Sequence, residues 1–332
     1  MKTEFDWGEL AFGSKKPLRE LDAIFIVAPR ELSTHRFAQL IKHYLPKGNI
    51  ILGLAKETYV LGFEDQPQFR MLELDESFKK LIAKINASSS KNKIYTLTYF
   101  QREFKHVIDK ITFQKVLLVN GSWKYVFHNS EAYYILANRQ IDYEMISPFA
   151  SEAEALEYNE RIGDEMRLIN WSKEPTGTFT EEEMLAFADK VAKLSFDHSF
   201  QCGVTLGRKT DKGYEYLAST FNEVVPFQTY ALHYGASREI NFSPPHDLNH
   251  YDTIHAEVAM IIKAAEQKID LNGTTLFINL LPCPSCARMF TQTTIAEFVY
   301  VQDHSAGYAV SLLEKAGKVI RRVVAQPNQK EG

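Results

Sequence analysis

Four residues able to do chemistry lie close together between His255 and Cys286. His255 precedes Glu257 by two positions, and Cys283 and Cys286 form a C-x-x-C pair. Imidazole nitrogen and thiolate sulfur are ligands that Zn²⁺ prefers, and a catalytic zinc site uses three protein ligands with the fourth position left to water. Because His255, Cys283 and Cys286 supply three such ligands, the segment predicts a zinc site.

Glu257 favours a catalytic zinc over a structural one. A structural site needs four closed ligands, and the third cysteine, Cys202, lies far upstream in a strand pattern. A carboxylate two residues from a ligating histidine can take a proton from a metal-activated water and pass it on. We therefore expect a hydrolytic centre, with a redox or purely structural metal site as the weaker alternative.

Two helix starts are expected to position these side chains. Pro284 suits the first helical position, which makes Cys283 the N-cap and puts the second cysteine of the pair in the first turn. The unpaired amides and partial positive charge there favour thiolates. His255 is expected in the opening turn of a second helix, capped by Asp252 or Thr253.

Strand and helix patterns alternate along both halves of the chain. In the first half, short apolar runs at 23–28, 49–55, 93–100 and 115–121 are separated by helical periods. This pattern is typical of buried parallel strands with crossover helices, so a small doubly wound α/β domain is predicted. Its role is open between docking, nucleotide binding and regulation, and we favour these over a second active site.

A linker separates this domain from a second one. KEPTGT carries the Pro and Gly of a linker, and a helix followed by five strand patterns comes after it. The predicted domains are residues 1–172 and 179–332. The five strand patterns are QCGVTLGR, YEYLASTF, TLFIN, EFVYVQD and VIRRVV.

Composition and charge narrow the classes of function. The chain has 332 residues, 45 % of them hydrophobic and 24 % charged, as in ordinary globular proteins. From Phe179 onward 14 Lys and Arg stand against 18 Asp and Glu, which argues against a long basic track for nucleic acid. With no apolar stretch long enough to span a membrane, no secretion signal and only three cysteines, a cytoplasmic location is expected.

The zinc-site residues carry a resemblance to a known family. H-A-E at 255–257 and P-C-P-S-C at 282–286 resemble the H-x-E…P-C-x-x-C signature of the cytidine deaminase superfamily. STFNEVVP and the segment VQDHSAGYAVSLLEKAGKVIRRV are most similar to deoxycytidylate deaminases, over about Glu181 to Val324. The resemblance implies a three-layer α/β/α fold with a five-stranded mixed sheet.

The resemblance also implies an activity and a set of contacts. It implies hydrolysis of a cytosine nucleotide, first of all dCMP to dUMP and ammonia, with Glu257 as the acid/base. The backbone amide of Ala256 would hold the pyrimidine carbonyl and Asn222 the sugar hydroxyl. Tyr308 is a candidate for stacking on the base, with core packing equally open. A homo-oligomer is also implied, and the expected partner is a small-molecule nucleotide.

Alternatives remain for the substrate. The connection from Glu223 to Tyr251 contains Arg238 as its only Lys or Arg, so basic residues for a 5′-phosphate are scarce there. A deaminase acting on single-stranded DNA, RNA or tRNA bases, with contacts from the first domain, is one alternative. A non-catalytic zinc module is the other, although a structural site places no demand on Glu257. The sugar and the phosphate count are left open.

Overall fold

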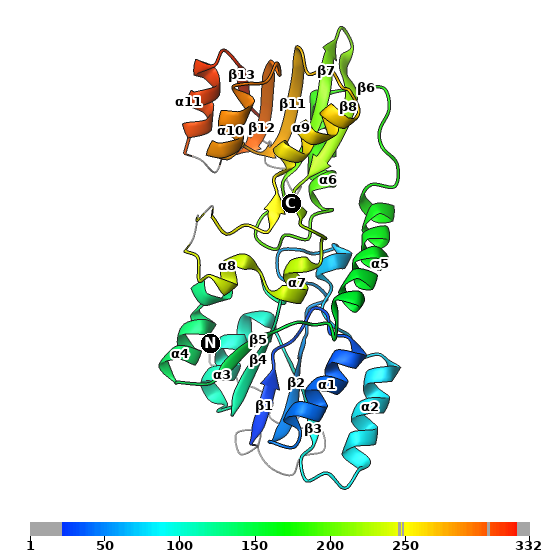
Figure 1. The fold of residues 1–332 in the computed structure, drawn as a ribbon, viewed down its shortest axis with the longest axis vertical. Coiled ribbons are helices and arrows are strands. Elements are labelled where there is room, and N and C mark those ends of the chain that lie inside the picture. Colours follow the sequence, from blue (N-terminus) through cyan, green and yellow to red (C-terminus); the bar gives the residue numbers. More distant parts are fainter. Residues whose placement is uncertain (1–21, 245–246, 248, 304–305, 324–332) are drawn as a thin grey trace, which may run out of the picture. The chain divides into compact units, whose positions relative to one another are not determined.

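The computed structural model describes residues 22–244, 247, 249–303 and 306–323, and the chain divides into two compact units (Figure 1). Unit 1 comprises the described residues up to Ile162 together with Thr229–Asp252. Unit 2 comprises Gly163–Gln228 and the described residues from Thr253 onward. No described helix is long and apolar enough to cross a membrane.

Unit 1 is built on a five-stranded parallel sheet with strand order β3-β2-β1-β4-β5. Every residue of the central strand β1 is buried, as expected for an apolar run covered on both faces. β5, a short strand with a polar residue at its second position, was not among the predicted strands. The strands are β1 (Ala23–Ile26), β2 (Asn49–Ala55), β3 (Ile94–Tyr99), β4 (Lys115–Val119) and β5 (Tyr143–Ile146).

Helices cover both faces of this sheet, which confirms the predicted doubly wound α/β class. α1 and α2 pack on the face that carries Ile24 and Ile26, and α3 and α4 on the face that carries Phe25. Local capping begins these helices: Ser33 Oγ accepts a hydrogen bond from the Arg36 amide at the start of α1. The helices are α1 (Thr34–Tyr44), α2 (Glu76–Ala87), α3 (Phe104–Lys110), α4 (Glu131–Asn138) and α5 (Glu152–Asn170), the last running past Ile162.

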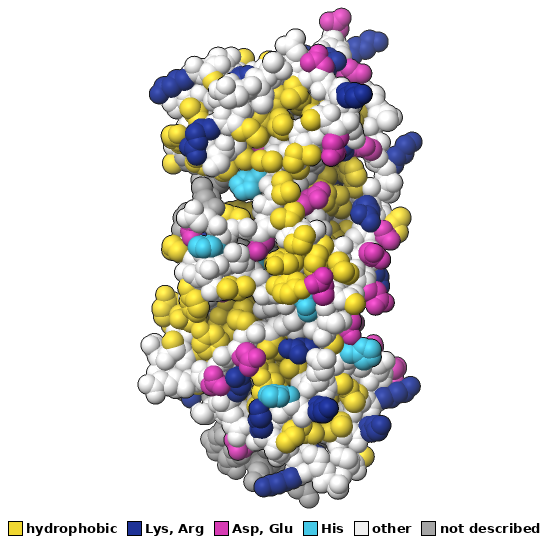
Figure 2. All heavy atoms as spheres, in the orientation of Figure 1, with side chains coloured by type: hydrophobic (Ala, Val, Ile, Leu, Met, Phe, Trp, Pro, Cys, Tyr) yellow, Lys and Arg dark blue, Asp and Glu magenta, His cyan; other side chains and the backbone are white. Residues whose placement is uncertain are grey.

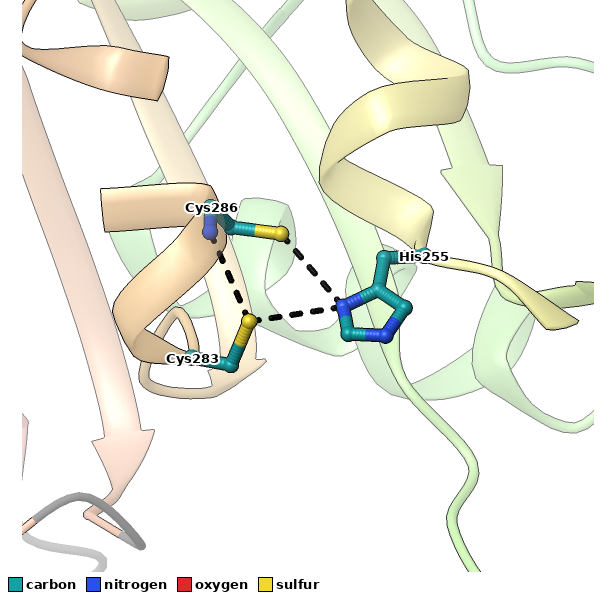
Figure 3. A group of neighbouring side chains, drawn as sticks. All are labelled: His255, Cys283 and Cys286. Atoms are coloured by element: carbon teal, nitrogen blue, oxygen red, sulfur yellow. Dashed lines mark hydrogen bonds between the residues drawn. The ribbon is translucent and has the colours of Figure 1, made fainter. Parts of the chain in front are cut away.

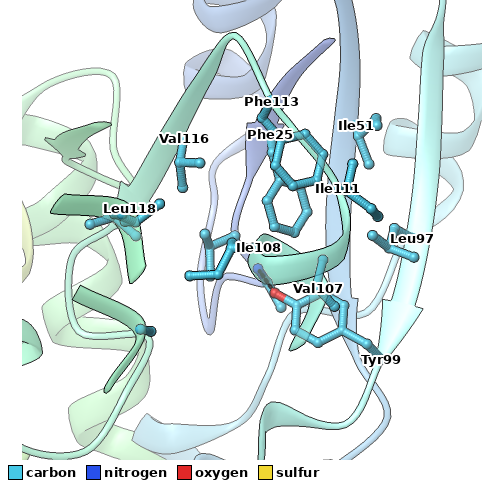
Figure 4. Packing of buried hydrophobic residues seen from close by; sticks show 14 of the residues in the cluster. Phe25, Ile51, Leu97, Tyr99, Val107, Ile108, Ile111, Phe113, Val116 and Leu118 are labelled. Atoms are coloured by element: carbon cyan, nitrogen blue, oxygen red, sulfur yellow. Dashed lines mark hydrogen bonds between the residues drawn. The ribbon is translucent and has the colours of Figure 1, made fainter. Parts of the chain in front are cut away.

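An aromatic core holds the second of these faces together (Figure 4). The rings of Phe25 and Phe113 are stacked with centroids 4.5 Å apart. Val107 and Ile108 of α3 pack into the same cluster, together with Leu97 of β3. Since successive side chains of a strand point to opposite faces, β1 contributes to both cores of unit 1.

The segment Thr229–Asp252 groups with unit 1 although it lies within the second predicted domain. It contains α7 (Tyr230–Tyr234) and α8 (Ser237–Ile240). Asn120 Nδ2 donates to the Leu232 carbonyl at 3.1 Å, and Thr229 Oγ1 donates to the Ala155 carbonyl at 2.8 Å. These contacts join residues far apart in the sequence, which a division at one linker does not describe. The boundary between residues 172 and 179 stays a prediction.

Unit 2 is built on a mixed sheet with strand order β13-β12-β11-β7-β8-β6. β11, β12 and β13 are parallel, and β7 pairs antiparallel with both β11 and β8. The predicted mixed sheet is confirmed, with the two-residue β6 as an additional sixth strand. The strands are β6 (Thr178–Phe179), β7 (Gly203–Thr210), β8 (Gly213–Phe221), β11 (Thr274–Leu280), β12 (Glu297–Gln302) and β13 (Val319–Arg322).

Helices on both faces of this sheet complete the predicted three layers. α6 packs through Met184 and Leu185 on one face, while the other three helices pack on the face that carries Leu276 and Ile278. A separate two-stranded ladder joins β9 (Glu223–Val224) to β10 (Thr253–Ile254), and β10 comes directly before helix α9 (Ala256–Glu266). The helices are α6 (Glu181–Ala192), α9 (Ala256–Glu266), α10 (Pro284–Phe290) and α11 (Tyr308–Lys315).

Candidate metal centre

His255 is the N-cap residue of α9. Its backbone is extended, with φ −66° and ψ 145°, so its side chain leaves the chain just before the first helical turn. Thr220 Oγ1, on β8, donates to the Ala256 carbonyl at 2.8 Å and anchors the start of α9 on the sheet. The expectation that Asp252 or Thr253 caps this helix is wrong. Thr253 lies in β10, and Asp252 accepts a hydrogen bond from the Ser237 amide.

Cys283 is the N-cap residue of α10, as the sequence predicts. Pro284 occupies the first helical position, and the Cys286 amide donates to Cys283 Sγ at 3.4 Å. Proline is suited to this position because its nitrogen has no proton to leave unpaired and its φ is already helical. One turn of helix therefore brings both thiols to the same end of α10.

The two helix starts meet at one point (Figure 3). His255 Nδ1 lies 3.5 Å from Cys283 Sγ and 3.4 Å from Cys286 Sγ, and the three ligand atoms lie within 4.8 Å of one another. Both cysteines are buried, whereas His255 is partly exposed. One nitrogen and two sulfur atoms this close together match the three protein ligands of a catalytic zinc site, in which the fourth position is left for water.

The protonation of the two thiols also fits a metal. Hydrogen bonding from Cys286, opposed by burial and supported by His255, lowers the pKa of Cys283 well below its usual range. Hydrogen bonding with Cys283, together with burial, raises the pKa of Cys286. The two shifts are opposite because the two sulfurs interact with each other. A bound divalent cation would keep both as thiolates, the form in which cysteine binds metal.

Glu257 lies beside this group without being one of its three ligands. It is in the first turn of α9, and only 3 % of it is exposed. Burial raises the pKa of its carboxyl group, against the opposing effect of a backbone amide and of His255. A buried carboxylate with a raised pKa takes up a proton more readily than one in water, which suits an acid/base role.

Asn222 is buried, and its side-chain amide is hydrogen bonded within the protein. Its Oδ1 accepts from the Cys202 amide at 2.8 Å, and its Nδ2 donates to the Phe200 carbonyl at 3.0 Å. Its backbone carbonyl accepts from Ser195 Oγ at 2.7 Å. Asn222 therefore ties the loop before β7 to the end of β8, and its contact with a sugar hydroxyl stays a prediction.

The other predicted contact residues lie at helix starts. Ala256 is fully buried at the first position of α9, where a backbone N–H has no acceptor within the helix. Tyr308, the first residue of α11, is 50 % exposed, so its ring is not part of the core. Cys202 packs against the core of unit 2, and burial raises the pKa of its thiol, as expected for a structural residue.

Two further residues position the site without having been predicted. Thr220 holds the start of α9. Asn279 on β11 holds the start of β7: its Oδ1 accepts from the Gly203 amide and its Nδ2 donates to the Gln201 carbonyl, at 3.0 Å each. Thr220 could have been found in the sequence, because strand alternation places it on the same face as Asn222. Asn279 has no comparable signal, since its partners are more than 70 residues away.

Comparison with known proteins identifies the class that this fold and site define. Residues 180–302 match the cytidine and deoxycytidylate deaminase zinc-binding region. The matched range contains the three residues of the metal group. This part of the chain therefore matches the zinc-binding region of that family, and the predicted resemblance and zinc cofactor are confirmed.

Individual relatives match shorter parts of the chain. The deoxycytidylate deaminases of Enterobacteria phages T2 and T4 are each 37 % identical over 51 residues, which is 15 % of this chain and 27 % and 26 % of theirs. ComE operon protein 2 of Bacillus subtilis (strain 168) is 29 % identical over 72 residues, covering 21 % of this chain and 38 % of its own. The chain thus spans less than half the length of each of these relatives.

Solved structures with some likeness include a dCMP deaminase from the cyanophage S-TIM5. Its apo form is 18 % identical, with 43 % of this chain and 95 % of that chain covered and a TM-score of 0.31. Its complex with dCMP and dUMP is 17 % identical, with 43 % and 96 % covered and a TM-score of 0.32.

Proposed function

We propose that this protein is a zinc-dependent deaminase that hydrolyses a free cytosine nucleotide, first of all dCMP to dUMP and ammonia. The observation that carries this proposal is the meeting of His255 Nδ1 with both cysteine sulfurs within 4.8 Å, beside the buried Glu257. A structural zinc site would need a fourth ligand and would place no demand on a buried carboxylate.

Each residue of the site would have its own role in this reaction. Bound zinc would supply a water that is deprotonated near neutral pH and so can attack the base. The Glu257 carboxylate would accept the proton of that water and transfer it to N3 of the cytosine ring as the oxygen bonds to C4. It would then move the proton of the new C4 hydroxyl to the amino group, so that the C4–N bond breaks and ammonia leaves. The Ala256 amide would bind the pyrimidine carbonyl, and the burial of Glu257 would keep bulk water from competing for the proton.

A free nucleotide suits the charge of unit 2. Acidic and basic side chains are interspersed over the face of this unit that is drawn in Figure 2. Binding of a polynucleotide depends on clustered cations that neutralise many phosphates. The phage relatives are deoxycytidylate deaminases, which supports dCMP as the first candidate. We further propose that Asn222 contacts the sugar and Tyr308 the base, and that the chain assembles into a homo-oligomer in the cytoplasm.

The test is ammonia release by the purified full-length chain, with its zinc content measured. The substrates are deoxycytidine, dCMP, dCTP, CMP and a cytosine-containing single-stranded oligonucleotide. We expect turnover of dCMP in the wild type and a loss of about 10²–10⁴-fold in Glu257→Gln at unchanged zinc content. Turnover of the oligonucleotide alone would move the assignment to polynucleotide deamination. Full activity of Glu257→Gln would contradict the proposed proton transfer.

A further inference from the structure

The sheet of unit 1 has the topology that places ligands at a defined edge. From β1 the chain proceeds outward to β2 and β3, then crosses back to β4 on the other side of β1 and continues to β5. The loops after β1 and β4 therefore lead away from each other. In open parallel α/β sheets, ligands bind at the carboxyl ends of the strands at such a reversal.

A cavity of about 350 Å³ lies at this edge. Its lining includes Ala28 after β1, Arg102 after β3, and Ser122, Trp123 and Lys124 after β4. All of these residues follow the last residue of a strand, so the cavity opens at the carboxyl ends. Its volume is within the range of roughly 300–1,000 Å³ that is typical of small-molecule sites.

The charged side chains of the cavity favour an anion. Arg102, Lys105 and Lys124 line it, against one carboxylate, Glu131, which pairs with Lys105. Arg102 and Lys124 lie over the rings of Phe100 and Phe63, at 5.2 Å and 4.9 Å from the ring centroids. These two cations are held by aromatic rings and keep N–H groups for a ligand.

Arg30 adds a buried positive charge behind the same loop. It is 2 % exposed, and its Nε, Nη1 and Nη2 atoms have no hydrogen-bond partner among the described residues. A Cβ on Gly121 would lie 3.6 Å from its Cζ, and its own amide donates to Ser122 Oγ at 3.2 Å. Burial lowers its pKa to about 10, so it remains charged at neutral pH. The guanidinium lies over the Phe69 ring, 4.7 Å from its centroid, and the charge of Glu31 raises its pKa. Because neither contact is a hydrogen bond, an anion that accepts from its N–H groups would offset the cost of burial.

Aromatic side chains supply the other half of the site. Trp123 and Phe127 line the cavity with ring centroids 5.0 Å apart, and Phe104 lies 6.2 Å from Phe127. Stacking on such rings is a common way to bind a nucleobase, because every base has an aromatic face. We propose that unit 1 binds a nucleoside phosphate in this cavity, with the base against Trp123 and Phe127 and the phosphates toward Arg102, Lys124 and the loop over Arg30.

Calorimetric titration of the full-length, zinc-loaded chain tests this proposal. The probes are ATP, GTP, dCTP and dTTP, with the four nucleosides and inorganic phosphate as separate arms. We expect at least one triphosphate to bind more tightly than both its nucleoside and phosphate alone. The double variant Arg102→Glu/Lys124→Glu should weaken that binding at least about tenfold, which is about 1.4 kcal/mol.

The matched control is Lys84→Glu, an exposed residue on α2, which covers the other face of the sheet. It should bind like the wild type, and circular dichroism should show all variants folded. If the double charge reversal does not fold, Arg102→Gln/Lys124→Gln takes its place. Two outcomes would overturn the proposal: no saturable binding of any triphosphate up to about 1 mM, or equal affinity in the wild type and the folded double variant.

Discussion

His255 and Cys283 are 28 residues apart in the sequence, yet each is the N-cap of a helix, and His255 Nδ1 lies 3.5 Å from Cys283 Sγ. Both helices pack in the same core cluster and begin at this contact. Since an N-cap residue has extended backbone, its side chain can turn toward a neighbouring chain end rather than along the helix. The metal centre thus depends on where two helices start.

Loss of one ligand should abolish zinc binding. His255→Ala and Cys286→Ser each leave two of the three ligand atoms. We expect zinc affinity to fall by more than the roughly 10–100-fold typical of changes around a metal site. Metal analysis of the purified variants after dialysis measures this. Cys202→Ser is the matched control, because Cys202 is outside the metal group, and it should keep the zinc content of the wild type.

Removal of the anchor of α9 should lower stability and disturb the site together. Thr220→Val removes the 2.8 Å hydrogen bond to the Ala256 carbonyl in a buried setting, and the loss of one such bond typically costs about 0.5–1.5 kcal/mol. Denaturant unfolding and zinc titration of the same preparation measure both effects. Thr291→Val removes a local hydrogen bond to the Arg288 carbonyl at a helix end and should change stability by less than about 0.5 kcal/mol. Equal effects of the two variants would argue against an anchoring role.

The stability of unit 2 should depend on acid through Glu181. Hydrogen bonds from both terminal nitrogens of Arg321 lower the pKa of this carboxyl group, against the effect of burial. A lowered pKa in the folded state means that stability is present above the ordinary pKa of 4.5 and is lost as the pH falls through the folded value. Because Arg321 is 41 % exposed, solvent screening limits the contribution to about 1 kcal/mol or less.

Thermal unfolding of the wild type and Arg321→Gln between pH 3 and pH 7 measures this dependence. The variant should unfold at a lower temperature at pH 7, and the difference should shrink as the pH falls below 4.5 and through the lowered pKa of Glu181 in the folded state. A difference that stays constant down to pH 3 would show that packing of Arg321, rather than its charge, stabilises unit 2.

The segment 229–252 should be released from the rest of unit 1 by loss of Glu239. This buried carboxylate accepts hydrogen bonds from the Phe127 amide, from Trp123 Nε1 at 3.3 Å, and pairs with His128 Nδ1 at 3.1 Å. Glu239→Ala leaves these groups unpaired, which typically costs about 3–5 kcal/mol for a buried pair. Limited proteolysis should then cut within 229–252 faster than in the wild type. Asn241→Ala, an exposed change in the same segment, should leave the cleavage rate unchanged.

The sequence by itself determined the candidate metal ligands and the strands that are buried on both faces. Cys283, Pro284 and Cys286 lie within one helical turn, so the cap that they form depends on contacts over three residues. The apolar runs of β1, β2 and β4 predict buried strands for the same reason, since the length and the apolar composition of a run are local properties. Local preferences of this kind are visible in the sequence because few residues decide them.

Only the tertiary structure decided which polar groups are hydrogen bonded to partners inside the protein. The resemblance predicts a sugar contact for Asn222, and the structure adds that its amide is hydrogen bonded to Cys202 and Phe200, about 20 residues away. Segment 229–252 joins unit 1 through contacts such as that of Asn120 with Leu232, 112 residues apart. Such partners are chosen by how the chain packs, because a buried polar group is satisfied by whatever partner packing brings within hydrogen-bond distance, however distant in sequence.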